Sequence, residues 1–141
     1  MIAAVLILVV AALYAVMGLF ALAAPGQVLQ RFGVSVETHD GRNEVRAVYG
    51  GFGLVVAGML IYAAFTSGRG ALWIPSIVAL SLIGMAAGRL ISMVLDRTRG
   101  SRLVWLFLII EVVTALMLFA AHTQYPVAAD YPQGAGTQQG Q

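Results

Sequence analysis

The chain has 141 residues, of which 60% are hydrophobic and only 10% carry a charged side chain, and its mean hydropathy is +0.90. Soluble domains have about 25% charged residues, so the composition excludes an ordinary soluble domain and is typical of a membrane protein. The net charge of +2 comes from scattered arginines, which gives no support for nucleic-acid binding. Cysteine is absent from the sequence, which excludes disulfides and thiolate metal sites.

The first apolar segment, 2–24, contains no charged residue. At about 1.5 Å per residue it is long enough to cross a hydrocarbon core of about 30 Å. It is longer than the hydrophobic region of a signal peptide and no basic residue precedes it, so we expect a retained transmembrane helix. A Pro-Gly pair then ends the helix.

The connection 25–42 contains apolar residues at helical spacing beside polar ones, namely Val28, Leu29 and Phe32. This pattern predicts a short helix lying in the membrane interface. An irregular loop with a few buried anchors is the alternative.

Three further apolar segments have membrane-spanning length, at 47–65, 71–95 and 103–121. The helix that contains the first is expected to run from about 43 to 66, and the last helix to end near 121 or 122. Asp40 or Asn43 is expected to cap the first of these helices. The polar turns at 67–70 and 96–101 are short, so consecutive helices should be antiparallel neighbours. We therefore predict an all-α protein, an antiparallel bundle of four transmembrane helices with a short interfacial helix in the first loop.

Two regions follow from this reading, a transmembrane domain at 1–122 and a tail at 123–141. The tail is rich in Gln, Gly and Pro and has no helical period. Such a segment is disordered in isolation, unless it packs on a partner or on the protein's own surface.

The arginines predict the orientation in the membrane. One side of the bundle carries most of them, namely Arg31, Arg42, Arg97, Arg99 and Arg102, whereas the other side has only Arg69. Arginine-rich short loops stay in the cytoplasm. We expect a multi-pass protein of the bacterial cytoplasmic (inner) membrane with both termini outward.

A few charged residues interrupt the apolar segments. Charge at the bilayer centre costs roughly 2.5–3.5 kcal/mol per group, and such groups nearly always face the bundle interior with a partner. Arg89 precedes Asp96 by about 10 Å of helix, and Glu111 follows Arg102 by about 13 Å, so both lie at similar depths from the same face. The prediction is a Glu111–Arg89 ion pair. The candidate cluster around it comprises Glu44, Arg46, Tyr49, Arg89, Ser92, Asp96 and Glu111.

Small residues mark two faces for close helix packing. Gly50 and Gly53 lie on the face of Arg46, and Gly84 and Gly88 form a GxxxG pattern in the third span. Both pairs are predicted to mediate helix packing.

The cluster has more than one reading. It can lock helix register without any ligand, or it can mark a binding or transport pathway, as intramembrane ionisable residues often do. Catalysis lacks support, because no nucleophile, metal set or cofactor motif accompanies the carboxylates, and His39 and His122 fall at opposite membrane faces. We expect no metal and no cofactor.

The leading hypothesis is a non-enzymatic accessory or scaffold subunit of a larger membrane complex. Its expected partners are membrane lipids and either other membrane subunits or a second copy. The alternative is a carrier or sensor that binds a lipid, quinone or other small amphipathic molecule through Arg46 and Arg89.

Three stretches carry a resemblance to a known family: Asn43-Glu44-x-Arg46-Ala47-x-Tyr49-Gly50-Gly51, then Gly88-Arg89-x-Ile91-Ser92 leading to Asp96, and Glu111 in the last span. Over residues 11–121 the chain resembles an uncharacterised bacterial domain-of-unknown-function family of small four-span membrane proteins, distantly similar to DoxX-like proteins. The resemblance implies the four-helix fold. It marks as signature positions Glu44, Arg46, Tyr49, Arg89, Asp96 and Glu111. It brings no established activity.

Overall fold

The computed structural model describes residues 2–66 and 69–123, and within 69–72 only the backbone. Four helices in this part are long and apolar enough to cross a membrane. They are α1 (Ile2–Ala23), a continuous helix from His39 to Phe65, α5 (Arg69–Leu95) and α6 (Arg102–His122). The continuous helix consists of α3 (His39–Val45), a π-helical turn η1 (Arg46–Gly51) and α4 (Phe52–Phe65). Before it lies the short helix α2 (Pro25–Gln30).

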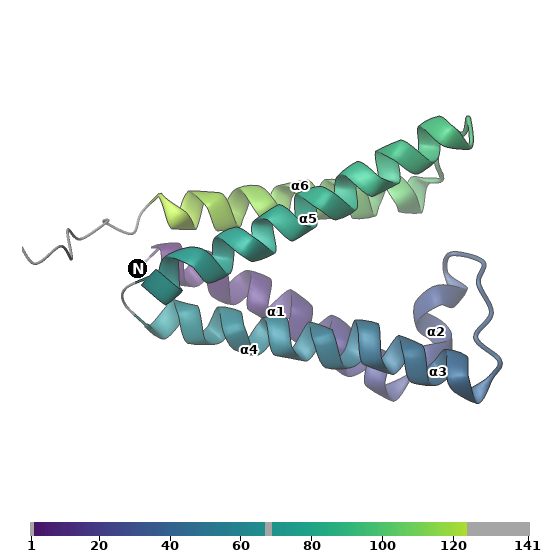
Figure 1. The fold of residues 1–141 in the computed structure, drawn as a ribbon, viewed down its shortest axis with the longest axis horizontal. Helices are drawn as coiled ribbons and strands as arrows, with labels where there is room; N and C mark the ends of the chain where they lie inside the picture. The colour runs from purple at the N-terminus through teal and green to yellow at the C-terminus, as the bar shows by residue number, and fades with distance from the viewer. Residues whose placement is uncertain (1, 67–68, 124–141) are drawn as a thin grey trace, which may run out of the picture.

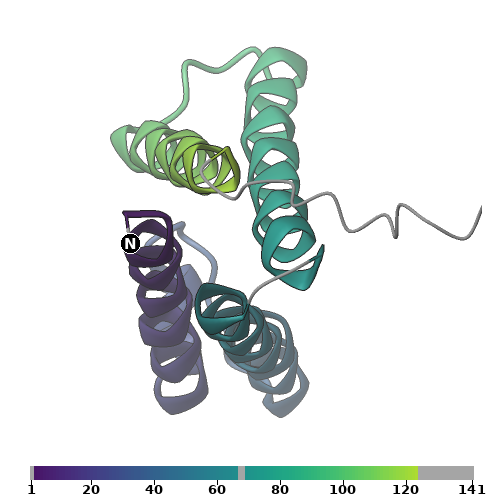
Figure 2. The same cartoon turned by 90° about the vertical axis from the view of Figure 1, so that its left-hand side faces the viewer.

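The four long helices form two antiparallel hairpins, α1 with α4 and α5 with α6 (Figure 1). The hairpins also contact each other, α1 with α6 and α4 with α5, so the end-on view is a ring of four helices (Figure 2). One end of the bundle holds the start of α1, the end of α4 and the end of α6, and the other holds α2, α3 and the α5–α6 turn. The predicted bundle is thereby confirmed, including the short helix in the first loop.

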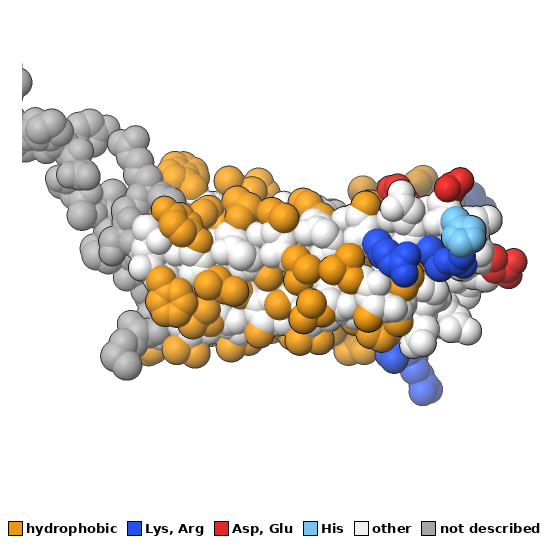
Figure 3. All heavy atoms as spheres, turned by 90° about the horizontal axis from the view of Figure 1, so that it is seen from below, with side chains coloured by type: hydrophobic (Ala, Val, Ile, Leu, Met, Phe, Trp, Pro, Cys, Tyr) orange, Lys and Arg blue, Asp and Glu red, His pale blue; other side chains and the backbone are white. Residues whose placement is uncertain are grey.

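The core lies where these helices meet. Ile7 and Val10 of α1, Leu60 of α4 and Leu118 of α6 are inaccessible to solvent, and Leu82 of α5 packs against the same cluster. Many other large apolar side chains point outward along the whole length, and the charged side chains visible in Figure 3 gather at one end. A bundle that is apolar inside and outside is suited to lipid rather than to water.

The first connection differs from expectation at the start of the second spanning helix. This helix begins at His39 rather than near residue 43, because the hydroxyl of Thr38 caps it by accepting a hydrogen bond from the Gly41 N–H at 3.0 Å. Neither Asp40 nor Asn43 is the cap. The π-helical turn that interrupts this helix was not predicted from the sequence.

Two predictions fall at or beyond the limits of the described residues. Residues 67 and 68 of the predicted 67–70 turn lie outside them, while Arg69 and Gly70 already belong to α5. The predicted tail lies outside them from residue 124 onward. The predicted end of the last helix agrees with the observed one at His122.

Candidate functional site

The centre of the candidate site is an ion pair between α5 and α6. Arg89 Nε donates to both carboxylate oxygens of Glu111 at 3.0 Å, and Arg89 Nη2 lies 2.9 Å from Glu111 Oε1. The Glu111 side chain is only 5% exposed, whereas the Arg89 side chain is 24% exposed. The carboxylate is therefore enclosed by the bundle, while part of the guanidinium faces outward.

Aromatic side chains surround the pair. The Arg89 guanidinium lies over the ring of Phe107, one helical turn before Glu111, at 5.4 Å from the ring centroid. Phe32, from the loop after α2, packs against Phe107 with the ring centroids 5.3 Å apart. From α1, the half-buried Tyr14 lies within electrostatic range of the Glu111 carboxylate. Residues of both hairpins thus shield the carboxylate.

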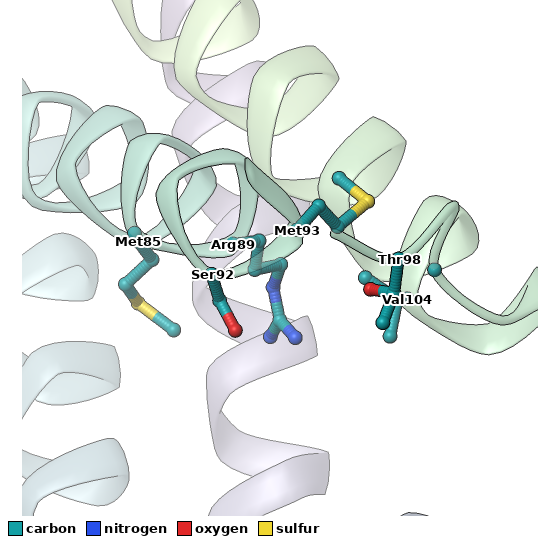
Figure 4. Close-up of a pocket in the computed structure, with 8 residues that line it drawn as sticks. Met85, Arg89, Ser92, Met93, Thr98 and Val104 are labelled. Carbon is teal, nitrogen blue, oxygen red and sulfur yellow. The ribbon is translucent and has the colours of Figure 1, made fainter. Parts of the chain in front are cut away.

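A groove with a volume of about 430 Å³ opens beside the exposed part of the guanidinium. Its walls come from α5, from the α5–α6 turn and from the first turn of α6: Met85, Gly88, Arg89, Ser92, Met93, Thr98, Gly100 and Val104. Figure 4 shows Met85, Arg89 and Ser92 projecting from the same side of α5, with Met93, Thr98 and Val104 toward the turn. The lining combines apolar side chains with one guanidinium and two hydroxyl groups. We call it the Arg89 groove.

The backbone conformation at the turn end of this groove requires a glycine. Gly100 has a φ of +67°, a conformation that residues with a side chain rarely adopt. An added Cβ there would also lie 2.7 Å from Met93 Sδ. Gly100 therefore allows a tight α5–α6 turn and lets Met93 approach the turn closely.

Arg46 does not join the ion pair, contrary to the arrangement expected from the sequence. Its Nε donates to the Leu22 carbonyl oxygen at 3.1 Å. Leu22 is in the last turn of α1, where carbonyl groups lack a partner within the helix and the helix dipole favours a positive charge. Arg46 thus caps the C-terminus of α1.

The other residues expected around the pair also lie elsewhere. Glu44 is exposed and makes no ion pair within the described part of the chain, and Tyr49 is partly buried in η1. Ser92 donates from its hydroxyl to Asp96 Oδ2 at 3.0 Å, at the rim of the Arg89 groove. The structure therefore brings together Arg89 with Glu111 and Ser92 with Asp96, and separates both from Arg46.

Of the four glycines predicted to mediate helix packing, two lie close to another helix in the described part of the chain and two do not. A Cβ at Gly50 would lie 2.6 Å from Leu22 Cδ2, and one at Gly53 would lie 3.5 Å from the Cα of Gly18. These two glycines therefore allow α1 to approach the second spanning helix closely. A Cβ at Gly84 or Gly88 would meet nothing within 4 Å, so the GxxxG pattern packs against no helix in the described part of the chain.

No group of three or more His, Asp or Glu among the described residues could hold a metal ion. His39 hydrogen bonds to Arg42 near the start of α3. At the other end of the bundle, Ser76 Oγ and His122 Nδ1 are hydrogen bonded at 2.9 Å, which connects α5 to α6.

Several residues of the site were not singled out from the sequence. Phe107 is not one of them, because its position four residues before Glu111 already predicts that the two share a helical face. Phe32 was expected only as an interfacial anchor, and Thr98 only as part of a turn. Their approach to Arg89 depends on how the first loop and the α5–α6 turn fold back, for which the sequence has no periodic signal.

The fold and the intramembrane ion pair define a small multi-pass helical membrane protein. The model of the family DUF4345, a domain of unknown function, matches residues 2–122, so the chain belongs to this family. No curated protein and no solved structure matches the chain. The resemblance found in the sequence was thus to a family of the right kind, while bacterial origin and similarity to DoxX-like proteins stay predictions.

Proposed function

We propose that this protein binds a small amphipathic molecule of the membrane, such as a lipid or quinone, in the Arg89 groove and acts as its carrier or sensor. The observation that carries the proposal is a groove of about 430 Å³ beside a guanidinium that is 24% exposed. Ligand pockets typically join an apolar lining to a few polar groups that orient the ligand.

The chemistry of Arg89 supports this proposal. Nε and Nη2 point at Glu111, and within the described residues Nη1 has no hydrogen-bond partner. A donor without a partner is costly in lipid, because no water is present to satisfy it. A ligand with an acceptor group would remove that cost.

The arginine distribution supports a location for the site. The end of the bundle that holds α2, α3 and the α5–α6 turn carries five of the eight arginines, namely Arg31, Arg42, Arg97, Arg99 and Arg102. By the positive-inside rule this end is cytoplasmic, which places both termini outward in a bacterial cytoplasmic membrane. The Arg89 groove then lies near the cytoplasmic leaflet.

Extraction of bound molecules tests the binding proposal. The protein would be purified from its native membrane in a mild detergent and extracted with organic solvent, and the extract analysed by mass spectrometry. We expect a membrane molecule to be enriched with the wild type and lost with Gly88→Leu, whose side chain would occupy the groove. Gly58→Leu on α4 is the matched control, because a Cβ at Gly58 also meets nothing within 4 Å. Equal enrichment with both variants, or none with the wild type, contradicts the proposal.

A second candidate function is the one that the sequence favoured, an accessory or scaffold subunit of a larger membrane complex. The exposed Gly84 and Gly88 face of α5 supports it, since GxxxG patterns allow close approach of a neighbouring helix. Native mass spectrometry after mild solubilisation tests it. A lone monomer at every detergent strength counts against an accessory role.

A further inference from the structure

We infer that the Arg89 groove selects an uncharged head group that accepts hydrogen bonds, such as an ester or quinone carbonyl, and excludes anionic head groups. The inference rests on the proposed function and names the ligand class of that site. It follows from the charge that lines the groove, from the hydrogen-bond donors there that have no partner among the described residues, and from the open face of α5 beside the groove.

The charge of Arg89 is already balanced. Three nitrogen–oxygen contacts of 2.9–3.0 Å connect its guanidinium to the Glu111 carboxylate, so the pair has no net charge. Among the described residues, Arg89 is the one charged residue that lines the groove, and Ser92 holds the negative Asp96 at the rim. Arg97 and Arg99 of the turn are exposed to solvent and do not line it. A phosphate or carboxylate entering the groove would lose its hydration and gain no net attraction from the lining, because the charge of Arg89 is already neutralised by Glu111.

The groove nevertheless offers hydrogen-bond donors. Arg89 Nη1 has no partner within the described residues, and the hydroxyl of Thr98 makes no hydrogen bond there either. The proton of the Ser92 hydroxyl is committed to Asp96. Two donors without a competing acceptor suit one or two carbonyl oxygens, and such hydrogen bonds are stronger at low dielectric than in water.

An open face of α5 extends from the groove toward the middle of the helix. Arg89 lies about 10 Å inward of Asp96, and Gly84 lies about 7.5 Å deeper, at 1.5 Å of rise per residue. Gly84 and Gly88 are exposed and have open space above their Cα atoms, and Met85 lies beside them on the groove wall. A hydrocarbon tail can lie along this face toward the bilayer centre while the head contacts Arg89 and Thr98.

A titration with three probes tests the ligand class. Purified protein in maltoside detergent would be titrated by native mass spectrometry with dioleoylglycerol, with a short-chain ubiquinone and with dioleoyl phosphatidate. Dioleoylglycerol and dioleoyl phosphatidate have the same tails and differ in the charge of the head. We expect at least one uncharged probe to bind about tenfold or more tightly than phosphatidate. The tighter of the two uncharged probes identifies a lipid or a quinone as the source.

Variants show whether binding occurs in the groove. Gly88→Leu should lower the affinity for the uncharged probe by about tenfold or more, whereas Gly58→Leu should leave that affinity unchanged. Thr98→Val keeps the shape and removes one donor, so it should weaken binding by about fivefold.

Each contrary result has a defined meaning. Tighter binding of phosphatidate, sensitive to Gly88→Leu, overturns the uncharged class and leaves the groove as a binding site. Failure of both uncharged probes to bind also overturns it. In that case, the molecules extracted from the native membrane decide separately whether the proposed function falls as well.

Discussion

Replacing Arg89 by leucine should destabilise the protein strongly, because it leaves the Glu111 carboxylate without its partner. The Glu111 side chain is 5% exposed, and its carboxylate makes three contacts of 2.9–3.0 Å with the Arg89 guanidinium. Breaking a buried pair by removing one partner typically costs about 3–5 kcal/mol. We expect Arg89→Leu to lower the free energy of unfolding by about 4 kcal/mol, near the middle of that range.

Replacing Glu111 by leucine should cost less stability than replacing Arg89. In Glu111→Leu the unpaired group is Arg89, which is 24% exposed and has a long flexible stem that can turn its charge toward the head groups. We expect a loss of about 2 kcal/mol. The double change to leucine removes both charges and should stay within about 1 kcal/mol of the wild type, because apolar residues often replace a buried pair without loss. These values give a coupling energy of about 5 kcal/mol or more between the two residues.

The assay is unfolding in mixed micelles by titration with dodecyl sulfate, followed by far-ultraviolet circular dichroism, on the wild type, both single variants and the double variant. All four must be measured in the same detergent, since the coupling energy is a difference among them. If the double variant loses as much stability as the two single variants added together, Arg89 and Glu111 do not stabilise each other and the reasoning is refuted.

The remaining predictions concern the contacts that hold the first hairpin and the loop. Gly50→Ala places a Cβ 2.6 Å from Leu22 Cδ2 and should lower the free energy of unfolding by about 1–3 kcal/mol in the same titration. Gly58→Ala, where nothing lies within 4 Å, should be neutral or stabilise by up to about 1 kcal/mol. Equal effects of the two variants would show that the close approach at Gly50 is unimportant. Arg46→Gln removes the cap on Leu22 and should cost about 1 kcal/mol, because the group is exposed; an unchanged midpoint contradicts that role. Phe32→Ala should speed amide hydrogen exchange in residues 31–38 but not in α4, and unchanged exchange in the loop would refute its anchoring role.

The four spans could be predicted from the sequence because apolar length is a strong signal in a chain that must satisfy its backbone in lipid. The Arg89–Glu111 pair could be predicted for a related reason. Two opposite charges at similar depth in consecutive spans have few other partners, so their meeting follows from helix direction and rise.

The place of Arg46 could not be predicted in this way. Its depth allowed it to join the pair, but its direction depends on the π-helical turn, which begins at Arg46 itself and changes how side chains before and after it face. The sequence also does not show that the Leu22 carbonyl, which accepts the hydrogen bond from Arg46, is available at the end of α1. Gly84 and Gly88 show a different limit, because a GxxxG pattern does not say whether the neighbour is in the same chain.

The ion pair lies within one hairpin rather than between the two. Arg89 belongs to α5 and Glu111 to α6, and Ser76 with His122 joins the same two helices at their other end. The first hairpin is held separately by Gly50 against Leu22. The pair therefore sets the register of α5 and α6, and it need not break when the two hairpins move relative to each other. The proposed ligand would meet the exposed part of the Arg89 guanidinium and would not have to separate the two charges, so binding and stability should respond to different substitutions.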